Sequence, residues 1–122
     1  MTYFLDTYAI IEFLKGNKNY IKFFKQTNIT TRLHLMELYY KSLRDFGKKL
    51  ANKFYARFLE YAIDFDDEII KEAMKFRLNM KNKGKDVSYT DCIGYILAKK
   101  KKVKFLTGDN EFKSLPNVEF VK

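Results

Sequence analysis

The chain has 122 residues, of which 47% are hydrophobic and 32% charged, and its formal net charge is +9. This length supports one compact domain with its own core, so we expect a single domain over residues 1–122. The excess of 24 Lys and Arg over 15 Asp and Glu favours a polyanionic partner, although a solvated lysine-rich surface explains the charge equally well.

The composition excludes two classes of protein. No apolar stretch approaches the roughly 20 residues that span a bilayer, and the N-terminus lacks the basic segment and cleavage site of a signal peptide. The single cysteine, Cys92, cannot form an internal disulfide and lies in an apolar run. We therefore expect a cytoplasmic protein without membrane contact.

The first third of the chain predicts a strand followed by helices. Residues 2–5 predict a buried strand, and a helix follows over residues 7–15, with Gly16 after its last turn. Residues 20–25 predict a second helical piece, and residues 29–31 are β-prone.

The middle third predicts two helices that form an antiparallel hairpin. The first covers residues 32–47, the second covers residues 48–61, and a short strand follows over residues 62–65. The apolar positions at helical spacing in the first helix are Leu33, Met36, Tyr40 and Leu43. Those in the second helix are Leu50, Phe54, Phe58 and Tyr61. We expect both sets to be buried.

The last third continues the alternation. Residues 66–84 predict an amphipathic helix with acids at its positive end, and Ser88 can cap a further helix that reaches residue 102. Strands over residues 103–106 and 118–121 close the chain. Strands that alternate with helices predict an α/β fold in which helices cover both faces of a mainly parallel sheet.

Four acidic residues of this basic chain lie at positions that are typical of a binding site. Asp6 follows the first strand directly, and Asp109 follows the strand over residues 103–106 across a Thr107-Gly108 turn. Ligands of open α/β sheets bind at the carboxyl ends of the strands. Glu37 lies beside the apolar stripe of its helix, and Asp91 lies in the first turn of another.

Each acid also has an ordinary structural explanation. Asp6 can cap the helix that follows it. Glu37 can lie at the edge of the apolar stripe with its carboxylate in water, or it can pair with Arg32, Lys41 or Arg44 along its helix. Asp91 stands three residues after Ser88, in a capping-box pattern, and Asp109 is a common turn residue.

Together, however, four carboxylates that converge repel one another unless a cation neutralises them. Oxygen ligands alone select Mg²⁺ or Mn²⁺, and such a site favours hydrolysis of phosphodiesters. Zinc sites, nucleotide-binding loops and nucleophilic triads all lack their residues here. The single histidine, His34, stands between Leu33 and Leu35, and we interpret it as structural.

The order and spacing of four short segments resemble a PIN domain, and more narrowly the VapC-type toxins of toxin–antitoxin pairs. The segments are Phe4-Leu5-Asp6-Thr7, Ile29-Thr30-Thr31 with Met36-Glu37-Leu38, Ser88-Tyr89-Thr90-Asp91, and Leu106-Thr107-Gly108-Asp109 before Phe112. The resemblance covers essentially the whole chain. It implies a PIN-like three-layer α/β/α sandwich.

The resemblance also implies a function for the acids. Asp6, Glu37, Asp91 and Asp109 match the family residues that bind Mg²⁺ or Mn²⁺ and support RNA hydrolysis, and a hydroxyl of Thr7 or Thr107 assists them. Glu111 takes the place of a more frequent aspartate two residues after Asp109, whereas Asp86 lies outside the motif. A homodimer and a small antitoxin partner are implied in addition.

We therefore expect a metal-dependent endoribonuclease that acts as the toxin of a VapBC-like pair. Two alternatives stay open. One is a PIN-domain nuclease that matures RNA without an antitoxin, and the other is a non-catalytic basic module that binds RNA or protein.

Overall fold

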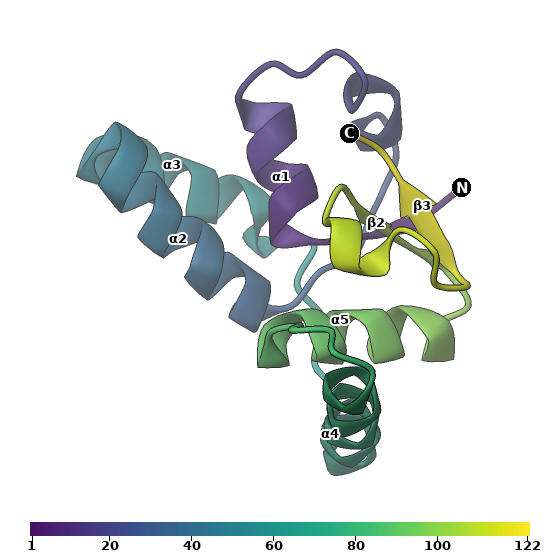
Figure 1. Cartoon of the computed structure of the whole chain (residues 1–122). Helices are drawn as coiled ribbons and strands as arrows, with labels where there is room; N and C mark the ends of the chain where they lie inside the picture. Colours follow the sequence, from purple (N-terminus) through teal and green to yellow (C-terminus); the bar gives the residue numbers. More distant parts are fainter.

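The computed structural model describes residues 1–122 as a sheet of three parallel strands surrounded by helices (Figure 1). The strands are β1 (Tyr3–Leu5), β2 (Lys104–Thr107) and β3 (Val118–Phe120), in the spatial order β1-β2-β3. Leu106 pairs with Leu5 on one side and Glu119 on the other. Because all three strands run in one direction, their carboxyl ends meet at one edge of the sheet.

Five α-helices and two short 3-10 helices connect and cover the strands. They are α1 (Thr7–Leu14), η1 (Ile21–Phe24), α2 (Arg32–Phe46), α3 (Lys48–Leu59), α4 (Asp67–Asn82), α5 (Tyr89–Lys100) and η2 (Asn110–Phe112). Side chains of Thr31, Asp66 and Ser88 cap α2, α4 and α5 by accepting a backbone N–H bond. None of the helices has the length and apolar character needed to cross a membrane.

Alternate residues of the strands enter two separate cores. Phe4 and Phe105 pack in one core with α4 and α5, while Leu5 and Leu106 pack in the other with α1, α2 and α3. Figure 1 shows α5 lying along one face of the sheet and α1 on the other, with the α2–α3 hairpin projecting to one side. The predicted α/β fold, with helices on both faces of a parallel sheet, is confirmed.

The predicted buried face of α2 is wrong. Met36, Tyr40 and Leu43 are exposed, at 57%, 66% and 39%, while Leu35 and Leu38 are buried. The inward face of α2 also contains His34 and Ser42, both buried. Because the buried face of α2 includes polar residues, a hydrophobicity pattern does not detect it. The exposed face contains Met36, Tyr40 and Leu43 at helical spacing, and the pattern therefore selects that face instead.

Smaller differences concern short elements. The predicted strand over residues 62–65 reduces to one bridge between Thr30 and Ala62. The β-prone segment over residues 29–31 pairs with β1 through a bridge from Ile29 to Phe4. The helical piece near residue 20 is the 3-10 helix η1. In α3, Phe58 is buried as predicted, but Leu50 is exposed.

Candidate active site

The carboxyl ends of β1 and β2 open into a small cleft of about 190 Å³. Its walls come from the start of α1, the middle of α2, the start of α5 and the segment after β2. The lining residues are Asp6, Thr7, Tyr8, Glu37, Lys41, Ser88, Asp91 and Asp109. The structure thus brings together the four acids that the sequence singles out.

Asp6 lies at the bottom of the cleft and is only 2% exposed. It occupies the N-cap position of α1, but its side chain makes no capping hydrogen bond, so helix capping does not explain it. Instead, the Thr107 hydroxyl donates to Oδ2 of Asp6 over 2.6 Å. The other oxygen, Oδ1, is buried and has no hydrogen-bond partner.

Glu37 reaches the cleft from α2. It forms no ion pair with Arg32, Lys41 or Arg44, so that structural explanation is also wrong. The Thr7 hydroxyl lies 3.0 Å from Oε1 of Glu37, as its donor, and 3.2 Å from the carbonyl oxygen of His34. Thr7 therefore ties the start of α1 to α2 and orients the Glu37 carboxylate.

Asp91 and Asp109 serve local structure with some of their atoms and face the cleft as well. The backbone N–H of Asp91 donates to Ser88 Oγ over 3.0 Å, which is the predicted helix cap. Asp109 accepts from the N–H of Glu111 over 3.0 Å, and its own N–H donates to Thr107 Oγ1 over 3.1 Å. These bonds use no carboxylate oxygen of Asp91 and only one of Asp109.

The electrostatics of the cleft penalise four negative charges. Burial raises the pKa of Asp6 well above its usual value, and the charges of Asp91 and Glu37 raise it further. Burial also raises the pKa of Asp91 to about 6, and the charges of Glu37 and Asp109 add to this effect. The cluster therefore holds its full negative charge only at a cost that a bound cation would remove.

The chemistry of this donor set fits a divalent cation. Four carboxylates offer the oxygen ligands that Mg²⁺ and Mn²⁺ prefer. The unpartnered Oδ1 of Asp6 provides an independent observation, because an orphaned buried carboxylate oxygen costs about 1–3 kcal/mol. A cation in the cleft would supply the partner that the protein itself does not.

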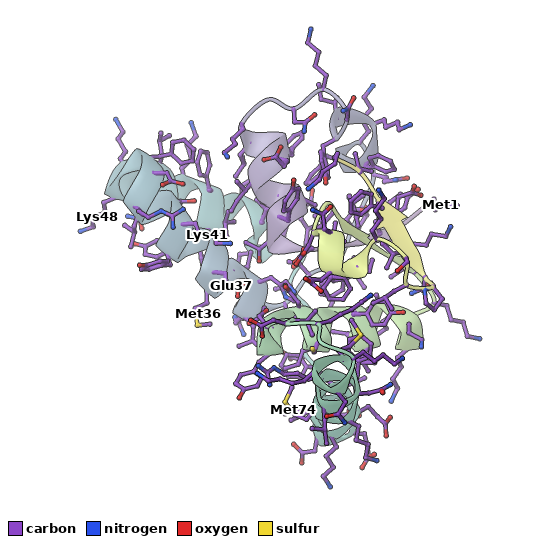
Figure 2. All side chains as sticks on the ribbon, in the orientation of Figure 1. Met1, Met36, Glu37, Lys41, Lys48 and Met74 are labelled. Carbon is purple, nitrogen blue, oxygen red and sulfur yellow. The ribbon has the colours of Figure 1, made fainter.

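Sequence reasoning missed some residues of the site. Lys41 is the only basic residue that lines the cleft. In the sequence, only its position one helical turn after Glu37 indicates that it belongs to the site. Figure 2 shows Glu37 and Lys41 on the side of α2 toward α1, whereas Met36 points the opposite way. Conversely, Glu111 does not line the cleft, and Thr107 lies behind Asp6 rather than in the wall.

His34 is a more significant omission. A ring nitrogen of His34, one carboxylate oxygen of Asp6 and one of Asp91 all lie within 4.8 Å of one another. The imidazole is completely buried, and burial lowers its pKa to about 3. No ordinary motif marks a histidine three residues before Glu37, so the sequence offered no signal for it.

Comparison with known proteins identifies the architecture. A family model described as "PIN domain" matches residues 3–118, and no curated protein matches the chain. The structure is similar to VapBC2 from Rickettsia felis, solved bound to a DNA fragment from its promoter, with a TM-score of 0.76 and 21% identity. That comparison covers 99% of this chain and 98% of the other.

Two other solved structures are similar over all or nearly all of their length. VapC20 from Mycobacterium tuberculosis, described as a sarcin-ricin-loop-cleaving toxin, has a TM-score of 0.75 and 16% identity, with 100% of both chains covered. A toxin–antitoxin complex from Klebsiella pneumoniae has a TM-score of 0.75 and 16% identity, with 96% of this chain and 95% of the other covered. At these identities the likeness concerns the fold alone.

Proposed function

Because the chain belongs to the PIN domain family, we propose that it is a metal-dependent endoribonuclease and the toxin of a VapBC-like toxin–antitoxin pair. One observation carries the proposal: Asp6, Glu37, Asp91 and Asp109 line a single cleft in a chain of net charge +9. A basic protein that gathers four carboxylates in one cleft is suited to bring a polyanion to a cation.

The four carboxylates would hold Mg²⁺ or Mn²⁺. When bound, the ion would polarise the phosphodiester and lower the pKa of a bound water. Thr107 holds Asp6 from behind through its hydroxyl, and Thr7 holds Glu37 in the same way. These bonds fix the carboxylates before the substrate arrives, so that little reorganisation is needed during reaction. Glu111 supports Asp109 through its backbone N–H.

Lys41 and Tyr89 extend the site toward RNA. Lys41 places a positive charge in the wall of the cleft, where it can bind a phosphate next to the scissile one. Tyr89 follows the cleft residue Ser88 and is 62% exposed, so its ring can stack on an unpaired base. The Arg77 guanidinium lies 4.3 Å from the centroid of that ring and adds charge beside it.

An antitoxin would bind the outer surface of the α2–α3 hairpin. This hairpin surface consists of Met36, Tyr40 and Leu43, together with an apolar groove of about 360 Å³ lined by Tyr39, Asn52, Tyr55, Ala56 and Leu59. A contiguous exposed apolar area of this kind marks a site of protein association. Glu37 and Lys41 lie on the opposite side of α2 from Met36, so a bound segment would cover the cleft only by passing around this helix.

The remaining features follow from the same proposal. We expect a homodimer, which a mass measurement in solution tests directly. We also expect action in the cytoplasm, where a toxin of this kind meets its RNA. A nuclease that matures RNA without an antitoxin would share the cleft but would have no antitoxin partner for the hairpin surface.

The central test is cleavage of a mixed pool of structured RNA by the purified, partner-free chain. The pool is incubated with Mg²⁺, with Mn²⁺ and with EDTA, and the wild type is compared with Asp91→Asn purified identically. We expect cleavage that requires the metal and falls at least about 100-fold in the variant. Asp86→Asn, in an exposed loop outside the cleft, is the matched control and should cut like the wild type.

The outcomes separate the alternatives. Metal-dependent cleavage that Asp91→Asn retains would exclude the acidic cleft as the active site. RNA binding without cleavage, unaffected by EDTA, would instead support the non-catalytic binding module.

A further inference from the structure

His34 occupies a sealed position beneath the acidic cleft. It lies in the first turn of α2 and is 0% exposed. Its ring packs edge-on against Phe4, with the centroids 5.0 Å apart. The ring also lies against Gly94 of α5, where a Cβ atom would be only 2.7 Å from Nε2. The imidazole therefore fits only because residue 94 has no side chain.

The two ring nitrogens have different surroundings. Nδ1 lies 2.7 Å from the hydroxyl oxygen of Thr31, and that oxygen also accepts the backbone N–H of His34. Nε2 is buried and has no hydrogen-bond partner. A histidine whose Nδ1–H donates to Thr31 presents an unprotonated Nε2 with a free lone pair. Burial keeps the ring neutral at physiological pH, since it lowers the pKa to about 3.

A second orphaned atom lies in the same neighbourhood. Oδ1 of Asp6 and Nε2 of His34 are the only two buried side-chain nitrogen or oxygen atoms of the chain without a hydrogen-bond partner. A ring nitrogen of His34 and carboxylate oxygens of Asp6 and Asp91 lie within 4.8 Å of one another. Opposite ligands of one ion stand about 4–4.5 Å apart, twice a bond of about 2.0–2.2 Å, so small side-chain movements would bring all three to one ion.

We propose that His34 supplies Nε2 as a nitrogen ligand to the metal held by Asp6 and Asp91, and that the site consequently prefers Mn²⁺ to Mg²⁺. Imidazole nitrogen favours first-row transition metals, whereas Mg²⁺ gains little from it. The inference rests on the metal site of the proposed function, and it changes an all-oxygen ligand set into a mixed one. Thr31 takes the role of the outer partner that fixes the tautomer of a ligating histidine.

The chain offers an unusually clean test, because His34 is its only histidine. Untagged protein is prepared with ¹⁵N-labelled histidine, loaded with Mn²⁺ and studied by pulsed electron paramagnetic resonance. We expect a ¹⁵N coupling to the manganese, which only His34 can produce. This measurement needs no variant, so a folding defect cannot obscure it.

A second measurement compares metal preference. Binding of Mn²⁺ and of Mg²⁺ is titrated for the wild type, His34→Gln and Ser42→Ala, the last altering another buried polar residue of α2. We expect His34→Gln to lose about tenfold or more of its preference for Mn²⁺ over Mg²⁺, and Ser42→Ala to keep it.

Failure of this inference is distinct from failure of the proposed function. Manganese bound without ¹⁵N coupling overturns the role of His34, even if the protein cleaves RNA. A ¹⁵N coupling in a protein that cleaves no RNA supports the ligand and contradicts the nuclease. A chain that binds neither metal overturns both.

Discussion

The Thr107 hydroxyl donates a 2.6 Å hydrogen bond to Oδ2 of Asp6, although 101 positions separate the two residues in the chain. The bond connects the carboxyl ends of the neighbouring strands β1 and β2. It holds one oxygen of the deepest carboxylate, while the other, Oδ1, has no hydrogen-bond partner. Asp6 is thus positioned by one strand neighbour and left available on its other side.

Removal of the Thr107 hydroxyl should weaken metal binding, although all four carboxylates of the site remain. We expect Thr107→Val, which keeps the shape of the side chain, to lower divalent-metal affinity and RNA cleavage about 10–100-fold. Thr107→Ser retains the hydroxyl and should restore most of both. Tyr95→Phe, which loses a 2.6 Å bond to the Pro116 carbonyl and does not line the cleft, should reduce stability alone. Equal metal affinity in Thr107→Val and wild type would contradict this role.

Neutralisation of Asp91 should stabilise the metal-free protein in a pH-dependent way. The pKa of Asp91 rises from 3.8 to about 6 on folding. Between these values the folded chain holds a proton that the unfolded chain releases, so this group's contribution to stability falls as pH rises from about 4 to 6.

Asp91→Asn should therefore raise the free energy of unfolding at pH 7.5 by roughly 1–3 kcal/mol, and much less at pH 4. Urea denaturation of both proteins in EDTA at the two pH values measures this difference. The sign is the decisive point: a variant less stable than wild type at pH 7.5 would rule out charge repulsion in the cleft.

Lys41 should act on RNA binding rather than on metal binding. We expect Lys41→Gln to weaken RNA binding and to reduce the slope of log affinity against log salt by about one. Its metal affinity should stay the same or rise slightly, because a positive charge leaves the cleft. Lys99→Gln, at the far end of α5, is the matched loss of one lysine. An identical salt dependence in Lys41→Gln and wild type would place this lysine outside the RNA path.

Gly94 should tolerate no side chain while His34 is present. A Cβ atom there would lie 2.7 Å from Nε2 of His34 and 2.9 Å from the Phe4 ring, and both residues are fully buried. We expect Gly94→Ala to cost about 1–3 kcal/mol of stability in place of the gain that alanine usually gives a helix. In a double-mutant cycle, adding His34→Ala should recover part of that loss. Purely additive effects would mean that the two residues do not compete for this space.

The hairpin surface should decide antitoxin binding without affecting catalysis. The measurement uses the proposed antitoxin, identified by its copurification with the wild-type chain. We expect Tyr40→Asp to weaken that complex by at least about tenfold, because it places a charge in an apolar interface. Ile21→Asp, an equally drastic change at an exposed residue of η1, should bind normally. RNA cleavage by both variants should equal that of the wild type.

Local sequence determined much of this protein. Alternating strands and helices predict the parallel α/β fold, since each element's period and caps depend on near neighbours: Gly16 follows α1, and Ser88 caps α5. The acids after β1 and β2 were foreseeable too, because parallel strands place their carboxyl ends at one edge of a sheet. Asp6 and Asp109 are therefore visible in the sequence as strand-end residues.

Only the tertiary structure decided the rest, because it concerns contacts between segments far apart in the chain. The inward face of α2 depends on how α2 packs against its neighbours, and its buried His34 and Ser42 conceal that face from any apolar pattern. The approach of His34 to Asp6 and Asp91 requires three elements and the bare backbone of Gly94. A periodic sequence pattern cannot predict this contact, because the contact forms only when separate elements pack together.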